Sequence, residues 1–268
     1  MTQGFQDVHR PVFIVGCGRS GTTILGASLS RHPQITYLNE PRNLWFTAYP
    51  ETDIWTKKAA ERCGRLVLTE ADVDQGKSQI LRQLFHAETV RTGRPVLVEK
   101  LPINNFRLPF IYKIFPDALF VHILRNGREV ARSIAQRSEA GRWFGANEYK
   151  WNQLSCYAAT RSDTSALPDI CTNYYEQGLL EWRLSVGAVR EFFRQIPERS
   201  CHELTYDEFV DSPVAAINGV LSFIGLDESP EVSDFVERNV VRKTDRLGLN
   251  DLSEKELRIG GDLLRSMR

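Results

Sequence analysis

The stretch from residue 11 to residue 42, PVFIVGCGRSGTTILGASLSRHPQITYLNEPR, decides the fold class of this chain. It begins with a short apolar run rich in β-branched residues, Pro11–Val15, which ends at a glycine and is typical of a buried strand. From Thr22 onward, apolar residues recur at helical spacing until His32-Pro33 ends the pattern. The sequence therefore predicts a strand, a glycine-containing turn and a helix in immediate succession.

The predicted turn is suited to bind an anion. Backbone N–H groups at a helix N-terminus point outward, and the helix dipole adds partial positive charge there. Gly16 and Gly21 have the spacing of a P-loop, but Thr22 stands where the P-loop lysine belongs, and the nearest cation is Arg19. We therefore expect a phosphate site that does not hold an ordinary ATP–magnesium complex. The alternative at this point is a tight strand-to-helix connection without a ligand.

Composition places the chain among ordinary globular proteins. Its 268 residues are 42% hydrophobic and 25% charged, and 34 basic residues balance 34 acidic ones, which favours neither nucleic acid nor an anionic membrane as a partner. Five cysteines without a C-x-x-C pair indicate reduced thiols rather than disulfides or a zinc site. Without an apolar leader or a run of about 18 apolar residues, we expect a cytoplasmic protein with no stable membrane insertion, unless a signal or anchor is missing from this sequence.

Strands and helices are predicted to alternate along the chain. Further strands are expected at 34–38, 95–98, 118–124 and 201–204. Helices are expected at 69–92, opened by a Thr69–Asp72 capping box and closed by Gly93, from Asn104 or Asn105 to 114, at 128–138, 173–195 and 213–224, and from 253. This order predicts an α/β fold with a central parallel sheet flanked by helices. Ligands bind beyond the carboxyl ends of such strands, where the loops at 16–22, 99–102 and 125–127 meet.

Two sequence motifs resemble motifs of the sulfotransferase family that uses 3′-phosphoadenosine 5′-phosphosulfate (PAPS). Gly18–Thr23 resembles the family's 5′-phosphosulfate loop, and Arg125 with Ser133, in RNGREVARS, is similar to its 3′-phosphate motif. The resemblance implies a P-loop-kinase-like, three-layer fold and a single sulfotransferase domain over residues 1–268. It places the PAPS-binding core at about 11–42, 95–138 and 201–225, and cover on the acceptor side at about 43–94 and 139–180.

Within the family, the pattern is most similar to the tyrosylprotein sulfotransferases and the related bacterial branch. That branch carries a glutamate after a His-Pro pair that follows the first helix, as in His32-Pro33 and Glu40. Cytosolic small-molecule sulfotransferases instead carry a catalytic histidine in a Lys-x-His-Leu-Pro stretch, which residues 99–102, EKLP, lack. The resemblance therefore implies Glu40 as the general base, while His122, inside a predicted strand, is expected in the core.

Sulfuryl transfer needs in-line positioning and cations where charge develops, rather than covalent help from the protein. The resemblance accordingly implies three catalytic residues, Glu40, Arg19 and Lys100, and no metal. It implies that PAPS, a co-substrate, is bound by Arg19, Ser20, Gly21, Thr22, Thr23, Arg125, Ser133, Tyr206 and Lys243. Arg42 and Trp143 are expected to contact the acceptor.

Several of these residues fit a structural role equally well. Tyr206 is either close to the 3′-phosphate or part of the core. Arg242 and Lys243 belong either to a basic loop that closes on the nucleotide or to a solvated run of charge. The aromatic residues at 143–157 either shape an acceptor pocket or pack under a lid.

Two other functions compete with sulfuryl transfer. A P-loop kinase of a small molecule or nucleoside is supported by the glycine spacing and by Val96–Glu99, which imitates a magnesium-binding strand, but the missing lysine argues against it. A non-catalytic nucleotide-binding protein is the second alternative. The expected partner is a hydroxyl-bearing acceptor, and peptide tyrosine, a sugar, a lipid or polyketide hydroxyl and a small phenol all stay open.

Overall fold

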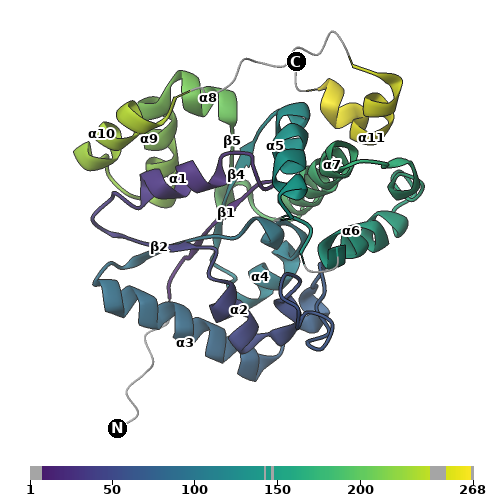
Figure 1. Cartoon of the computed structure of the whole chain (residues 1–268). Coiled ribbons are helices and arrows are strands. Elements are labelled where there is room, and N and C mark those ends of the chain that lie inside the picture. Colours follow the sequence, from purple (N-terminus) through teal and green to yellow (C-terminus); the bar gives the residue numbers. More distant parts are fainter. Residues whose placement is uncertain (1–7, 142, 146–147, 242–251, 267–268) are drawn as a thin grey trace.

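The computed structural model describes residues 8–141, 143–145, 148–241 and 252–266. Its strands form one parallel sheet in the order β2-β3-β1-β4-β5 (Figure 1). They are β1 (Val12–Val15), β2 (Ile35–Asn39), β3 (Val96–Lys100), β4 (Leu119–Leu124) and β5 (Cys201–Thr205). The predicted α/β class, with a central parallel sheet, is confirmed.

Helices cover both faces of the sheet. They are α1 (Thr22–Leu29), α2 (Arg42–Ala48), α3 (Gln75–Thr92), α4 (Leu108–Ile114), α5 (Gly127–Glu139), α6 (Tyr149–Ala159), α7 (Tyr174–Phe193), α8 (Tyr206–Asp211), α9 (Pro213–Ile224), α10 (Pro230–Asn239) and α11 (Glu254–Arg265). Within the described ranges, no helix combines the length and hydropathy that a membrane crossing requires.

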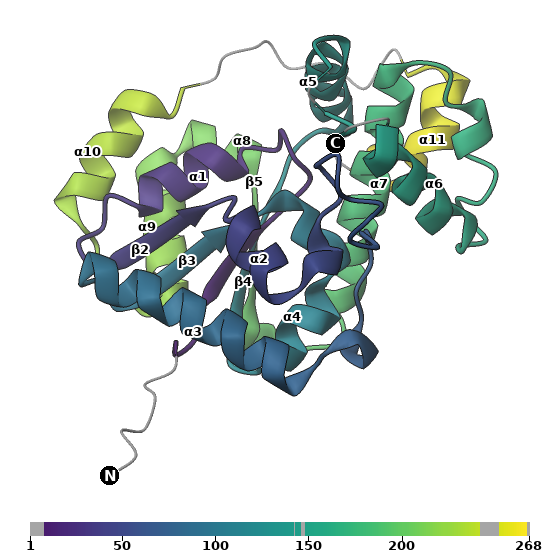
Figure 2. The same cartoon turned by 60° about the horizontal axis from the view of Figure 1, so that its bottom comes forward.

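Side chains that point alternately to the two faces of the sheet form one hydrophobic core on each face. The sheet and the helices on its two sides therefore make three layers. Val12 and Ile14 of β1 pack with α1, α9 and α10 on one face. Phe13 and Val15 pack on the other face, with α2, α3, α4, α5 and α7. Figure 2 shows the two groups of helices on opposite sides of the sheet. Because successive side chains of a strand point to opposite faces, a continuous apolar strand such as β1 has to be covered on both sides.

The parallel register brings the predicted loops together. Ile14 in β1 pairs with Lys100 at the end of β3, and Val15 pairs with His122 in β4. The loops that follow these strands therefore leave the sheet at the same edge, as the sequence predicts. Residues 40–42, which follow β2, join them there because Asn39 also pairs with Lys100.

The start of α3 corrects one prediction. The Thr69–Asp72 capping box forms, but it caps the start of a single 3-10 turn and not the start of the long helix. The helix begins at Gln75, where the side chain of Asp74 accepts a hydrogen bond from the N–H of Lys77. The predicted end is correct, because Gly93 adopts a left-handed conformation with φ of 69°.

Asn104 and Asn105 correct another prediction. Neither caps a helix: both are buried in a 3-10 turn, and α4 begins only at Leu108. The side-chain amide of Asn104 donates to Glu99, while Asn105 accepts a hydrogen bond from the N–H of Gly16 and donates to the hydroxyl of Ser185. These two residues therefore tie the turn after β3 to the sheet, to the loop that follows β1 and to α7.

Glu99 carries a buried carboxyl group beneath the edge where the loops meet. It is 0% exposed, and its Oε1 accepts hydrogen bonds from Trp45 Nε1 at 2.9 Å and Asn104 Nδ2 at 3.2 Å. Burial raises the pKa of Glu99 to about 8. The two hydrogen bonds and the charge of Lys100 act in the opposite direction, but burial outweighs them. The folded protein therefore keeps this carboxyl protonated at neutral pH, whereas the unfolded chain releases the proton above about pH 4.3.

We expect Glu99→Gln to stabilise the protein in a pH-dependent manner. Between about pH 4.3 and pH 8 the folded state binds a proton that the unfolded state has lost, so the free energy of unfolding falls as pH rises. Glutamine removes that penalty, so the gain in Tm should grow with pH and reach at least about 2–4 °C near pH 8, equivalent to about 1 kcal/mol. Calorimetry at several pH values measures it, with exposed Glu237→Gln as the control. A gain that stays constant with pH would refute the assigned protonation state.

Candidate active site

The loop between β1 and α1 has a backbone that few side chains tolerate. Gly16 and Gly21 have φ of 147° and 101°, and Arg19 between them has φ of 77°, a left-handed conformation that is costly for a residue with a Cβ atom. A Cβ atom on Gly21 would lie 2.7 Å from the ring of Tyr206. The Gly16 N–H donates to Asn105 Oδ1 at 2.9 Å, which fixes the start of the loop.

The first turn of α1 presents donors to a cavity of about 360 Å³ beside this loop. The helix begins at Thr22, and no side chain caps it. Its first N–H groups have no acceptor within the helix, and partial positive charge gathers there. Ser20 and Thr22 are buried, while Thr23 is exposed. The cavity is lined by Arg19, Gly21, Thr22, Thr23, Ile24, Ala27, Arg125, Tyr206, Val210, Asn239, Val240 and Val241.

The arginine and the serine of the predicted 3′-phosphate motif, Arg125 and Ser133, both contact Arg19 of the loop. Arg19 Nε donates to Ser133 Oγ at 2.9 Å, and an Arg125 guanidinium nitrogen donates to the Arg19 carbonyl at 3.2 Å. The Arg125 guanidinium also packs on the Tyr206 ring, 4.2 Å from its centroid, and its Nε donates to Glu129 at 2.8 Å. The structure thus joins Arg125 and Ser133 through Arg19.

Positive charge is concentrated around Arg19. Burial, together with the charges of Arg137 and Arg125, lowers the pKa of Arg19, and only the more weakly acting Glu40 opposes this. Like charges held this close favour an anionic ligand between them. Lys243, the remaining predicted cation of this group, lies outside the described residues, as does Arg242.

Glu40, directly after β2, is joined to Lys100 and Arg42. Lys100 Nζ donates to Glu40 Oε1 at 2.8 Å and to Thr23 Oγ1 at 3.1 Å, and an Arg42 guanidinium nitrogen donates to Glu40 Oε2 at 2.6 Å. Glu40 has a left-handed φ of 51°, and its N–H donates to the Lys100 carbonyl at 2.7 Å. Lys100 is 1% exposed. The ammonium group that the P-loop pattern lacks is therefore supplied by the neighbouring strand.

Glu40 is ionised at neutral pH. Burial opposes its ionisation, but the hydrogen bonds and charges of Lys100 and Arg42 outweigh burial, and the pKa of Glu40 lies below the ordinary glutamate value. A carboxylate in this position can accept a proton.

A second cavity, of about 330 Å³, opens on the other side of Arg19. Arg42 and Trp143, the two predicted acceptor contacts, both line it. Its walls are Gly18, Arg19, Glu40, Arg42, Trp55, Pro102, Ile103, Asn105, Phe106, Arg137, Trp143, Lys150, Glu181 and Ser185. Arg19 thus lines both cavities, while Lys100 contacts Thr23 on the first and Glu40 on the second.

Sequence patterns do not identify two charged residues of this second cavity, Lys150 and Glu181. They form an ion pair 31 positions apart, with 2.5 Å between Nζ and Oε1. The only signal in the sequence is the aromatic segment at 143–157, which is expected either at an acceptor pocket or under a lid. Its Trp143 lines the cavity and donates from Nε1 to Glu181 Oε2 at 2.7 Å.

A buried arginine holds the segment that contributes Trp55. Arg107 is 0% exposed and donates to the backbone carbonyls of Thr52, Arg65 and Leu66. Burial lowers its pKa to about 9. Because carbonyl oxygens of an irregular segment need partners when they are buried, Arg107 fixes this part of the cavity wall.

Two residues that the sequence suggests as alternative functional residues, His122 and Glu99, lie apart from both cavities. His122 is 0% exposed in β4 and shares a 2.7 Å hydrogen bond with Glu203, which confirms its predicted place in the core. Glu99, the carboxylate of the kinase alternative, is hydrogen-bonded to Trp45 and lines neither cavity.

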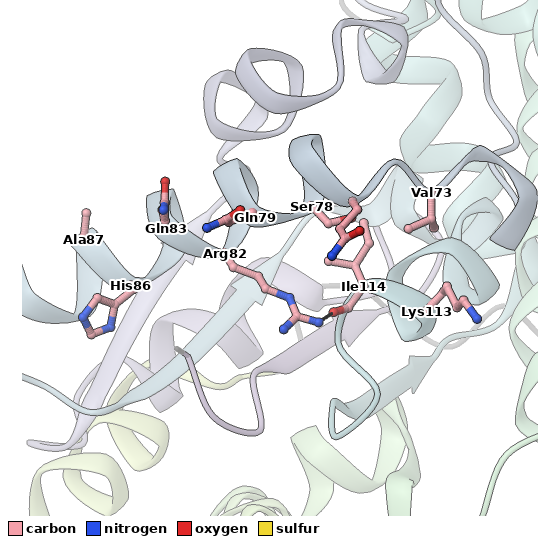
Figure 3. Close-up of a pocket in the computed structure, with 10 residues that line it drawn as sticks. Val73, Ser78, Gln79, Arg82, Gln83, His86, Ala87, Lys113 and Ile114 are labelled. Carbon is pink, nitrogen blue, oxygen red and sulfur yellow. Dashed lines mark hydrogen bonds between the residues drawn. The ribbon is translucent and has the colours of Figure 1, made fainter. Parts of the chain in front are cut away.

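A larger cavity, of about 800 Å³, lies between α3 and the end of α4. Figure 3 shows its polar lining, which includes Gln79, Gln83 and His86 on α3 and Lys113 on α4. Among the described residues, it shares no lining residue with the two cavities beside the loop between β1 and α1, and no predicted site residue lines it.

Known proteins share sequence with most of this chain. The model of the sulfotransferase family matches residues 11–230. Protein-tyrosine sulfotransferase 2 of Gallus gallus is 24% identical over 273 residues, which cover 96% of this chain and 66% of that protein. Protein-tyrosine sulfotransferase 1 of Homo sapiens is 31% identical over 150 residues, which cover 53% of this chain and 40% of that protein.

A solved structure shares the fold. The sulfotransferase domain from the curacin biosynthetic pathway aligns with a TM-score of 0.59 at 12% identity, over 96% of this chain and 98% of that one. The chain spans 40% to 66% of the length of the two relatives named above. The family match runs from the residue before β1 to the first residue of α10 and includes both cavities' loops. The chain belongs to the sulfotransferase family.

Proposed function

We propose that this protein transfers the sulfuryl group of PAPS to a hydroxyl group of an acceptor, with Glu40 as the general base. One observation carries the proposal: the Lys100 ammonium contacts both Thr23, in the first turn of α1, and Glu40, on the second cavity. A single cation therefore stands where a donor held by the loop and an acceptor held by Glu40 would meet.

The residues of the 360 Å³ cavity fit a nucleotide with two separate phosphate groups. The uncapped N-terminus of α1, with the Thr22 and Thr23 hydroxyls, suits a 5′-phosphate. Arg125 and Ser133 suit a 3′-phosphate, since both contact Arg19 and Arg125 lines the cavity. When bound, PAPS supplies the sulfuryl group and a phosphate leaving group.

The chain's own residues then have distinct tasks. Glu40 accepts the proton of the acceptor hydroxyl, and Arg42 orients Glu40 through the 2.6 Å hydrogen bond. Lys100 and Arg19 stabilise the negative charge that develops on the oxygens around sulfur. Because both cations are already fixed, by Thr23 and Ser133, little reorganisation is needed during the reaction.

The second cavity suits a phenol as the acceptor. Trp55, Trp143 and Phe106 supply aromatic walls around Glu40, and flat aromatic surfaces pack well against a phenol ring. The relatives named above are protein-tyrosine sulfotransferases, which supports a tyrosine-like hydroxyl. No comparable observation favours the kinase alternative, because Glu99 faces away from both cavities.

Titration calorimetry with 3′-phosphoadenosine 5′-phosphate (PAP) tests whether the protein binds the proposed nucleotide. In a buffer containing EDTA we expect wild-type Kd values of micromolar or tighter, about −8 kcal/mol or better. Arg125→Ala should weaken binding about 10- to 100-fold, since hydrogen bonds to charged groups contribute about 1.5–3 kcal/mol. Arg91→Ala, an exposed arginine of α3, is the matched control. Absent PAP binding together with magnesium-dependent ATP binding would favour the kinase.

A further inference from the structure

The acceptor-side cavity contains a buried ion pair that the proposed chemistry does not use. Lys150, in the first turn of α6, is 1% exposed, and Glu181, in α7, is 4% exposed. Their 2.5 Å contact lies in the wall of the 330 Å³ cavity. A buried ion pair contributes little to stability compared with apolar residues of the same volume. A function for Lys150 therefore has to be sought in the cavity that it lines.

The Lys150 ammonium retains hydrogen-bonding capacity. It carries three N–H donors, and within the described part of the chain its one side-chain acceptor is Glu181. The second oxygen of Glu181 is occupied by Trp143 Nε1, so the carboxylate also holds the indole in place. Aromatic rings surround the ammonium, with centroids at 4.3 Å for Trp143 and 5.0 Å for Trp55. The Phe144 ring lies farther away, with its centroid at 5.7 Å. Such rings attract the cation but accept no strong hydrogen bond, so an oxygen that enters the cavity would be a better partner for the ammonium.

Trp55 links this cation to the catalytic carboxylate. Its ring packs against Arg42 as well, 4.3 Å from the guanidinium carbon, and Arg42 in turn is bonded to Glu40. A flat acceptor that lies along the two tryptophans therefore meets Glu40 near one part of the cavity and Lys150 near another. The cavity lining also carries four cations, Arg19, Arg42, Arg137 and Lys150, against two carboxylates, Glu40 and Glu181.

We propose that Lys150 determines acceptor specificity by binding an anionic oxygen group, such as a carboxylate, on a small phenolic acceptor whose hydroxyl lies at Glu40. Glu181 is a positioning residue, which orients both Lys150 and Trp143. The inference rests on the proposed function, because it names the acceptor class of the same site.

A matched pair of acceptors tests this proposal on the unmodified protein. The compounds 3-(4-hydroxyphenyl)propanoate and 3-(4-hydroxyphenyl)propanamide have the same shape and differ in one charge. With PAPS as the donor, we expect kcat/KM for the carboxylate to exceed that for the amide at least about tenfold, as for a hydrogen bond to a charged group. Equal values for the two acceptors would overturn the proposal.

Lys150→Met should abolish the preference. We expect kcat/KM for the carboxylate to fall about 10- to 100-fold, through KM, while the amide changes less than about threefold. The ratio of the two acceptors is measured on one sample, so partial loss of folded protein does not affect it. Lys150→Arg should keep part of the preference, and Lys113→Met, an exposed lysine of α4, should keep all of it. An equal loss for both acceptors would assign Lys150 a structural role only.

The outcomes separate this inference from the function on which it rests. If neither phenol is sulfated while PAP still binds, the acceptor class is wrong and the nucleotide assignment stands. If PAP does not bind, the proposed function itself fails. If Lys150→Met does not fold, the double variant Lys150→Met with Glu181→Gln removes both charges and repeats the comparison.

Discussion

Replacing Glu40 with glutamine is expected to lower kcat by about 10²–10⁴-fold, the contribution of a positioned general base. Glutamine keeps the size and hydrogen-bonding oxygen of the side chain but cannot take the proton of an attacking hydroxyl. Glu40 lines the acceptor cavity and not the nucleotide cavity, so the Kd for PAP should change little. A variant that keeps more than about a third of the wild-type kcat would show that Glu40 is not the base.

The pH dependence of the wild-type enzyme tests the same assignment. Because Lys100 and Arg42 outweigh burial and hold the pKa of Glu40 below its ordinary value, Glu40 stays ionised to a lower pH than an ordinary glutamate. As pH falls from about 8 to 5.5, kcat/KM should therefore show no loss that comes from the base. An acid limb near about pH 6.5 would point to a histidine instead.

Replacing Lys100 with methionine is the second change with a large expected effect. We expect kcat to fall about 10²–10³-fold, the range measured when one fixed donor to a developing negative charge is removed. Two partners lose their donor at once, because the ammonium bonds both Glu40 and Thr23. Rate measurements at saturating PAPS, with Lys113→Met as the matched control, give the size of the effect.

Combining the two substitutions tests whether the two residues act together. Glu40 and Lys100 are in direct contact at 2.8 Å, so their effects on kcat should not add. The double variant is expected to be little slower than the more impaired single variant. Strictly additive losses would mean that Lys100 acts independently of the base.

The sheet and its ligand-binding edge could be predicted from sequence because their determinants are local. Val12–Val15 and Leu119–Leu124 are continuous apolar runs that end at glycine or polar turns, and the resulting strands are buried on both faces. The parallel arrangement then fixes where the loops go. This is why the sequence places Arg19, Lys100 and Arg125 at one edge.

Local signals fail where a motif has more than one use. Thr69–Asp72 satisfies the capping-box pattern but closes only a 3-10 turn, and a second cap, Asp74, opens the helix. Asn104 and Asn105 have the residue type of a helix cap, yet their amides are used by long-range contacts instead. Tertiary packing decides between such uses, and a single sequence does not contain that choice.

The residues of the acceptor-side cavity were the hardest to predict from the sequence, for the same reason. Lys150 and Glu181 come from separate helices, and their contact depends on how α6 packs against α7. The segment that contains Trp55 is held by Arg107, which donates to the carbonyls of Thr52 and Arg65 from much further along the chain. Neither arrangement has a spacing that a motif could reveal.

Sulfuryl transfer by the wild-type protein tests the proposed function directly. Purified protein is mixed with PAPS and a phenol in the presence of EDTA, and PAP and the sulfate ester are quantified together. We predict equal amounts of both products, and a loss of about 10²-fold or more in rate with Glu40→Gln. Formation of a phosphate ester from ATP and magnesium, with no sulfate ester from PAPS, would show that the protein is a kinase and refute the proposed function.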